Sequence, residues 1–266
     1  MGDCIVERQG GVMLIRFNRP SAMNAMGGTL IQELNEALDE AQWDDAVRAI
    51  VVTGEGRAWC AGADLQAMGA SGSLGEPRQG ARASALDAVG GAGRTIRRLQ
   101  EIDKPTIAAV NGVVVGGGFG LCSAFDIRIA SEEARFSTIF IKRALGPDFG
   151  LSWFLPRLVG PQAAADLFFT GRMVGAAEAL SLGIVLRVVP ADRLLAETME
   201  YAGTLAKQPP TALTYTRRAL RASPTNTLDR QLEMEWVHQK SALASKEFQE
   251  GVRAFLEKRE PDYSAF

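Results

Sequence analysis

Two apolar runs in this chain each end in a glycine-bearing turn, and this repetition limits the fold more than any other feature. Residues 47–54 are nearly continuously apolar and lead to the turn at residues 59–65. Residues 106–110 form a similar run that leads to the glycine cluster at residues 116–120. Runs of this kind indicate buried strands. We therefore predict an α/β protein of strand–turn–helix units, with both turns at strand ends.

Turns in this position favour the binding of an anion. Ligands collect at strand ends of sheet enzymes, and the helix that follows leaves several backbone amides without partners. These amides and the helix dipole, roughly half a positive charge, stabilise a developing anion. The two turns thus have the layout of an oxyanion hole. Either cluster alone is also consistent with a tight bend in which a side chain would clash.

Two other glycine motifs match poorly. A dinucleotide-binding loop would need a third glycine where the second cluster has Leu121. A phosphate-binding loop would need a G-K-[ST] sequence after the glycines, and none follows. The backbone amides therefore remain the chemically informative part of both turns.

The composition indicates a protein that folds without covalent staples. Of its 266 residues 47% are hydrophobic, which is ample for a sizeable core. It has three cysteines at unrelated spacings and no basic segment followed by an apolar one at the N-terminus, so we expect a reduced, cytoplasmic protein. No apolar run approaches the roughly 18 residues that span a bilayer, so we expect no membrane association. The net charge of −2 offers no field for nucleic acid.

The single histidine excludes several mechanisms at once. A Ser-His-Asp or Cys-His arrangement would have to use His238, which lies in a helical pattern far along the chain from both turns. We expect a structural or surface role for this residue. The chain has no C-x-x-C or H-x-x-x-H pair, so we expect no metal site. Any chemistry must then use carboxylates and backbone amides.

The apolar pattern predicts further elements around the two runs. The first residues indicate a hairpin of strands at 4–8 and 12–17. A helix follows a capping-box pattern formed by Thr29 and Gln32. Residues 69–93 are rich in Gly, Ser and Ala, which is typical of a mobile loop beside a binding cleft. Further expected elements are a helical face at residues 89–99 and a strand at residues 126–130.

The character of the sequence changes at Pro190. From there on the apolar residues repeat at helical spacing only, and Pro261 stops the last helix. We therefore divide the chain into an α/β core at residues 1–190 and a helical region at residues 191–266. The helical region is expected to serve in packing or oligomerisation.

Five motifs occur in order from about residue 5 to about residue 260. They are Asn18-Arg19-Pro20 with Met23-Asn24-Ala25, Cys60-Ala61-Gly62-Ala63-Asp64-Leu65, Asn111-Gly112 with Gly116-Gly117-Gly118, Phe154-Leu155-Pro156-Arg157-Leu158-Val159-Gly160, and Glu250-Gly251-Val252 with Phe255-Leu256-Glu257-Lys258-Arg259. Together they resemble the enoyl-CoA hydratase/isomerase family, the crotonase superfamily. The resemblance implies a spiral of repeated ββα units with a C-terminal helical trimerisation region. Such proteins are usually trimers or dimers of trimers.

The resemblance also implies an acyl-CoA substrate. Its thioester oxygen would lie between the backbone amides of Ala63 and Gly117. The residues that would line the CoA site by the same match are Ala22, Ala61, Asp64 and Leu65. Phe255 and Lys258 in the last helix would reach a CoA, such as that of a neighbouring subunit, although an amphipathic helix with a solvated charge explains this pair equally well. CoA enters only as part of the substrate, and no metal or redox cofactor is implied.

One departure from the family pattern bears directly on the reaction. Family hydratases hold a water between two glutamates, and the aligned positions in this chain are Gly120 and Phe140. Neither residue can act as an acid or a base, so we do not expect hydration by the usual route. Phe140 is instead expected to line the substrate site.

A different carboxylate, Asp148, matches the aspartate that shuttles a proton in dienoyl-CoA isomerases and in ring-enoyl isomerases of phenylacetate breakdown. Apolar neighbours such as Leu145 and Phe149 would desolvate this carboxylate and raise its pKa. Pro-Asp-x-Gly is also an ordinary turn sequence, so a purely structural role stays open. The position carries the nucleophile in the 4-chlorobenzoyl-CoA dehalogenase branch, but the histidine base of that branch has no candidate here.

We therefore expect isomerisation of an enoyl-CoA double bond through a dienolate, with Asp148 as the proton carrier. Two alternatives remain at this point. One is a 2-enoyl-CoA hydratase with atypical acid and base residues, and the other is a non-catalytic acyl-CoA-binding or RNA-binding member. The net charge and the lack of a lysine-rich helix weigh against RNA.

Overall fold

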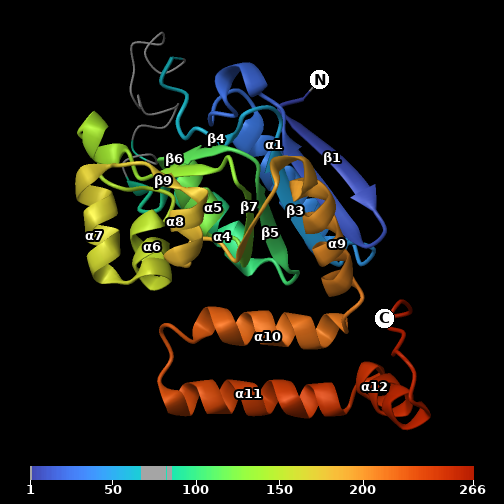
Figure 1. Cartoon of the computed structure of the whole chain (residues 1–266). Coiled ribbons are helices and arrows are strands. Elements are labelled where there is room, and N and C mark those ends of the chain that lie inside the picture. Colours follow the sequence, from blue (N-terminus) through green and yellow to red (C-terminus); the bar gives the residue numbers. More distant parts are fainter. Residues whose placement is uncertain (1, 67–81, 83–85) are drawn as a thin grey trace.

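The computed structural model describes residues 2–66, 82 and 86–266 of the chain. Most of the loop that the sequence predicts at residues 69–93 falls on 69–81 and 83–85, which lie outside the described residues. Figure 1 shows an upper body of sheets and helices and, below it, a separate helical layer. No helix in the described part of the chain has the length and apolar character needed to cross a membrane.

The described strands form two sheets. The larger sheet has, in spatial order, β1 (Cys4–Gln9), β2 (Val12–Phe17), β3 (Ala49–Gly54), β5 (Thr106–Val110), β7 (Ile127–Ser131) and β10 (Arg187–Val189). The smaller sheet has β4 (Ala58–Cys60), β6 (Val113–Val115), β8 (Arg135–Ser137) and β9 (Val174–Gly175). The hairpin is antiparallel, whereas β2, β3, β5, β7 and β10 run parallel. The predicted hairpin and buried strands are confirmed.

Helices connect these strands and cover the sheets (Figure 1). Those of the core are α1 (Leu30–Trp43), α4 (Gly90–Glu101), α5 (Gly117–Ser123), α6 (Leu151–Val159), α7 (Pro161–Thr170) and α8 (Ala176–Ser181), with the 3-10 turns η1 (Pro20–Ala22) and η2 (Phe140–Arg143). Later in the chain lie η3 (Ala191–Arg193), α9 (Leu194–Ala206), α10 (Pro210–Ala222), α11 (Leu228–Leu243) and α12 (Lys246–Glu257).

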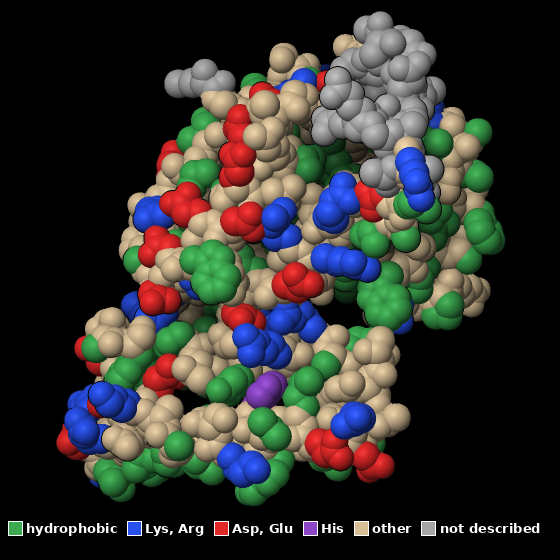
Figure 2. Space-filling model, turned by 180° about the vertical axis from the view of Figure 1, so that it is seen from behind, with side chains coloured by type: hydrophobic (Ala, Val, Ile, Leu, Met, Phe, Trp, Pro, Cys, Tyr) green, Lys and Arg blue, Asp and Glu red, His purple; other side chains and the backbone are tan. Residues whose placement is uncertain are grey.

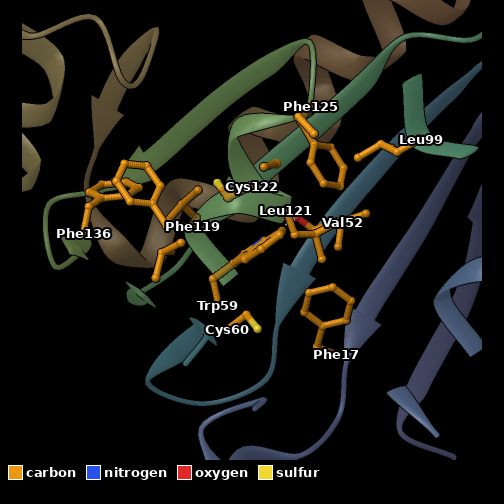
Figure 3. Packing of buried hydrophobic residues seen from close by; sticks show 14 of the residues in the cluster. Phe17, Val52, Trp59, Cys60, Leu99, Phe119, Leu121, Cys122, Phe125 and Phe136 are labelled. Atoms are coloured by element: carbon orange, nitrogen blue, oxygen red, sulfur yellow. Dashed lines mark hydrogen bonds between the residues drawn. The ribbon is translucent and has the colours of Figure 1, made fainter. Parts of the chain in front are cut away.

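The core is centred on Trp59 of β4 (Figure 3). Its ring meets Phe17 edge-on at 5.1 Å between centroids, and Phe125 at 5.8 Å. The indole N–H donates to the Val52 carbonyl at 3.0 Å, which joins the two sheets. Helix α5 lies close to β4, because a Cβ atom on Gly118 would be 2.3 Å from the Cys60 carbonyl oxygen. A glycine is therefore required here to bring the second turn against the first.

The region after Pro190 has two parts. Helix α9 packs on the larger sheet, where Leu194 and Ala202 are buried with Val51 and Ile107. Helices α10, α11 and α12 form the layer below the core (Figure 1). The projecting layer thus begins at α10, whereas the predicted division at residue 190 precedes α9.

The predicted capping box is wrong. Helix α1 does begin after Thr29, but the Thr29 side chain accepts no hydrogen bond from the helix. An Asp3 oxygen accepts from the Thr29 amide at 2.8 Å instead. Glu33 accepts from the amide of Cys4 at 2.7 Å, so this carboxylate ties α1 to the first strand. Gln32 takes no part, because its amide donates to Glu36.

Candidate active site

The two glycine-bearing turns meet in the structure. Met26 forms a parallel bridge with Ala63, and its amide donates to the Gly62 carbonyl at 2.6 Å. Gly62 has a φ of +80°, and a Cβ atom placed on it would lie 3.4 Å from the Gly117 nitrogen and 2.8 Å from the Val115 carbonyl oxygen. The turn after β4 therefore lies directly against the first residue of α5.

Two amides at this junction are available to a ligand. Among the described residues, neither the Ala63 amide nor the Gly117 amide has a hydrogen-bond acceptor. Gly117 is the first residue of α5, where an amide has no intrahelical partner. The later amides of Phe119 and Gly120 are satisfied, because both donate to the Gly116 carbonyl. Free amides on two adjacent turns are the donors that an oxyanion hole requires.

Asp148 lies over the start of α5. Its Oδ1 atom is 3.1 Å from the position that a Cβ atom on Gly117 would take, and the Phe149 ring is 3.0 Å from the same position. The residue as a whole is exposed in the single chain. Burial of its carboxyl group nevertheless raises the pKa of Asp148, only partly offset by a hydrogen bond from its own backbone. The sequence-based expectation of a raised pKa agrees in direction.

The two positions that hold glutamates in family hydratases are apolar. Phe140 is buried, with 7% of its surface exposed, and its ring lies 3.9 Å from a Cβ position on Gly116. Gly120 faces the backbone of residues 148–149, with a Cβ position 2.9 Å from both carbonyl oxygens. Among these neighbours Asp148 supplies the carboxylate.

The residues expected at the CoA site are brought together around the first turn. The Ala61 amide donates to the Met23 carbonyl at 3.1 Å, which places it beside η1 and its last residue, Ala22. The Asp64 carboxylate forms an ion pair with Arg19 at 2.9 Å. Leu65 is exposed.

Asn24 and Arg19, two motif residues for which the sequence predicts no role, hold this loop in place. Asn24 is fully buried with a φ of +53°, and its side-chain amide donates to the carbonyls of Ala58 at 2.7 Å and Glu55 at 2.9 Å. The guanidinium of Arg19 bonds both Asp64 and the Ala25 carbonyl. The motif was a signal for both residues, but their partners Glu55, Ala58 and Asp64 lie 31 to 45 positions away in the sequence.

Phe255 and Lys258 are not brought to this site within the same chain. Both belong to the end of α12, in the helical layer away from the two turns (Figure 1). Phe255 is 81% exposed. His238 lies in the same layer, where its ring stacks on Tyr215 at 4.5 Å (Figure 2). Within the described residues no group of three or more His, Cys, Asp or Glu side chains is arranged to hold a metal ion.

Parallel strands, two adjacent turns with free amides and one neighbouring carboxylate make this an α/β protein with a candidate anion-binding site. The family model for enoyl-CoA hydratase/isomerase matches residues 7–265. The protein belongs to this family, whose members act on acyl-CoA thioesters, and it has the crotonase fold.

Named relatives carry out different reactions. The chain is 36% identical to an Escherichia coli protein named 1,2-epoxyphenylacetyl-CoA isomerase, over 96% of this chain and 95% of the relative. It is 33% identical to a crotonyl-CoA hydratase of Syntrophomonas wolfei, over 98% and 97% of the two chains. A crystal structure of a Bacillus anthracis enoyl-CoA hydratase superposes with a TM-score of 0.91 at 31% identity and covers 100% of both chains. The family is thus established, and the reaction is not decided by these names.

Proposed function

We propose that the protein moves a double bond within the acyl group of an enoyl-CoA thioester. The thioester oxygen would accept hydrogen bonds from the amides of Ala63 and Gly117. The Asp148 carboxylate would remove a proton from an acyl carbon, and the electron pair of that C–H bond would be delocalised onto the thioester oxygen as a dienolate. Return of the proton to another carbon moves the double bond and regenerates Asp148, so no other reactant is consumed.

The observation that carries this proposal is the Asp148 carboxylate beside Gly117, at a site where positions 120 and 140 hold no acid or base. Hydration needs one group to deprotonate water and another to protonate carbon, whereas isomerisation is served by one group that takes and returns a proton. A raised pKa makes the carboxylate a better base toward carbon. The Escherichia coli relative is likewise named as an isomerase of a CoA thioester, although of an epoxide.

Hydration of a 2-enoyl-CoA is the second candidate, since the Syntrophomonas wolfei relative is named as a hydratase. It would require acid and base groups other than those at the usual positions. A member that binds acyl-CoA without catalysis is the remaining alternative.

We also propose how the substrate is held. The residues assigned to its binding are Ala22, Ala61, Asp64, Leu65 and Phe140, with Phe255 and Lys258 contributed by a neighbouring subunit. This arrangement requires more than one copy of the chain, which we expect to form a homotrimer or a hexamer, and the exposed apolar side chains of α11 and α12 support such an assembly (Figure 2). No metal or redox cofactor takes part in the proposed steps.

A screen of 2-enoyl-, 3-enoyl- and dienoyl-CoA thioesters tests the reaction class. Isomerisation leaves the mass unchanged and alters the ultraviolet spectrum, whereas hydration adds the mass of one water. In deuterated buffer, the acyl chain should also gain deuterium whenever the protonated Asp148 exchanges with solvent before it returns the proton. A water-mass product would favour the hydratase, and binding without any product would favour the non-catalytic alternative.

A further inference from the structure

Gly120 lies against a piece of backbone that leaves no room for a side chain. A Cβ atom on residue 120 would be 2.6 Å from the Cβ atom of Phe149 and 2.9 Å from the carbonyl oxygens of Asp148 and Phe149. These neighbours are backbone atoms and a Cβ atom, so no change of rotamer relieves the contact. Gly117 and Gly120 are three residues apart in α5, and the same segment covers both.

The covering segment is held from its other side by α6. The Leu151 amide donates to the Asp148 carbonyl at 3.0 Å, and the Phe154 amide donates to the Gly150 carbonyl at 3.0 Å. Phe149 has a φ of +47°, which is strained for a bulky residue and persists only where the surroundings fix it. The segment therefore cannot move away from α5 without disturbing the start of α6.

We propose that Gly120 is a positioning residue, whose missing side chain seats residues 148–149 on α5 and so sets the Asp148 carboxylate over Gly117. In this chain, a glutamate at position 120, as in family hydratases, is incompatible with the observed position of residues 148–149 on α5, and therefore with the position of Asp148. The effect of Gly120 on turnover rests on the proposed isomerase function, whereas its effect on the position of residues 148–149 does not. Asp148, and not a glutamate at position 120, then supplies the carboxylate near the amides of Ala63 and Gly117.

Two measurements on Gly120→Ala test the seat. The matched control is Gly203→Ala in α9, where a Cβ atom meets nothing within 4 Å. Hydrogen exchange should become faster in peptides covering residues 146–153 of Gly120→Ala and stay unchanged in the control. Turnover of the enoyl-CoA should fall by roughly tenfold to a hundredfold with little change in KM, because the carboxylate is displaced while the amides remain. Unchanged exchange and unchanged turnover would overturn the proposal.

The outcomes separate the seat from the reaction. Faster exchange in Gly120→Ala, with a wild type that isomerises nothing, would leave the seat standing and remove the proposed function. If the wild type isomerises an enoyl-CoA but Gly120→Ala changes neither turnover nor hydrogen exchange, the positioning role of Gly120 is wrong and the proposed function stands. Gly120→Glu should lose isomerisation and gain no hydration, and a variant that performs both reactions would contradict the mutual exclusion.

A second background keeps the test informative if Gly120→Ala folds poorly. Phe149→Gly removes the Cβ atom at 2.6 Å, and glycine adopts a φ of +47° without strain. The stability and turnover lost through Gly120→Ala should therefore be smaller in the Phe149→Gly background than in the wild type. Equal losses in both backgrounds would show that the two residues are not coupled and would overturn the seat.

Discussion

The Asp148 carboxylate lies against Gly117, the first residue of α5, with Oδ1 of Asp148 3.1 Å from the Cβ position of residue 117. The proposed proton carrier and the proposed donor to the thioester oxygen are thus adjacent. They come from segments about thirty residues apart that meet only in the folded chain.

Removing the Gly117 amide should impair catalysis far more than adding a side chain does. Gly117→Pro deletes the N–H at the first helical position, where proline is tolerated. Gly117→Ala keeps the N–H and adds a similar Cβ atom, which meets Phe149 at 3.0 Å in both variants. Turnover of the proline variant should be roughly a hundredfold to a thousandfold below that of the alanine variant. Equal turnover in the two folded variants would exclude this amide from the reaction.

The activity should decline on the acidic side at a pH set by Asp148. The base must be deprotonated, and burial raises its pKa above the ordinary value of 3.8. The rate should therefore be lost as the pH falls through this raised value, before an ordinary aspartate would titrate. The pH profile of kcat/KM measures this, with circular dichroism to verify folding. A profile that stays flat down to the ordinary range would contradict the assignment.

Arg217 should be important for the attachment of the helical layer to the core. The residue is 5% exposed, and its guanidinium pairs with Asp126 at 2.7 Å and donates to the carbonyls of Leu99, Gln100 and Ile102 at the end of α4. Arg217→Ala leaves the three carbonyls without this donor, whereas Asp126 keeps its bonds from Thr106, and the free energy of unfolding should fall by about 3 kcal/mol.

The matched control for Arg217 is Arg230→Ala, which removes an exposed ion pair with Glu233. Its effect on the free energy of unfolding should stay within about 1 kcal/mol. Chemical denaturation of both variants gives the comparison. Similar losses in the two would show that the buried network does not anchor α10.

The protein should assemble through its helical layer. The large side chains exposed there include Leu232, Trp236, Phe255 and Leu256. An apolar surface of this kind is typical of an interface. Sedimentation velocity at micromolar concentration should show at least three copies of the 28.5 kDa chain. A single monomer boundary would refute the assembly, and with it the contribution of Phe255 from a neighbouring subunit.

Much of the fold follows from patterns within single segments. The apolar runs that form β3 and β5 and the hairpin around Gly10 are predicted because burial and turn chemistry act on neighbouring residues. The strands of the smaller sheet have only two or three residues each, too few for a periodicity to be read. Their positions depend on tertiary packing.

The candidate site also depends on contacts between distant residues, which patterns within single segments do not predict. Glycines at 62 and 117 indicate turns with free amides, but the ion pair of Arg19 with Asp64 joins residues 45 positions apart. The positive φ of Phe149 has no local signal, because a bulky residue in this conformation is held by its neighbours. Resemblance to the family identified Asp148, and the packing of Phe149 on Gly120 became visible only in the structure.

Asp148→Asn tests whether Asp148 is the base of the reaction, because it keeps the shape of the side chain and removes the basic carboxylate. Its thermal midpoint at pH 7 should equal or exceed that of the wild type: the raised pKa favours the protonated form in the folded state, so the charged carboxylate opposes folding at neutral pH. The measurement is the rate of double-bond migration with deuterium incorporation from solvent. We expect this rate to fall by several orders of magnitude, with the affinity for acyl-CoA little changed. A folded Asp148→Asn protein that isomerises and exchanges deuterium at the wild-type rate would contradict this expectation.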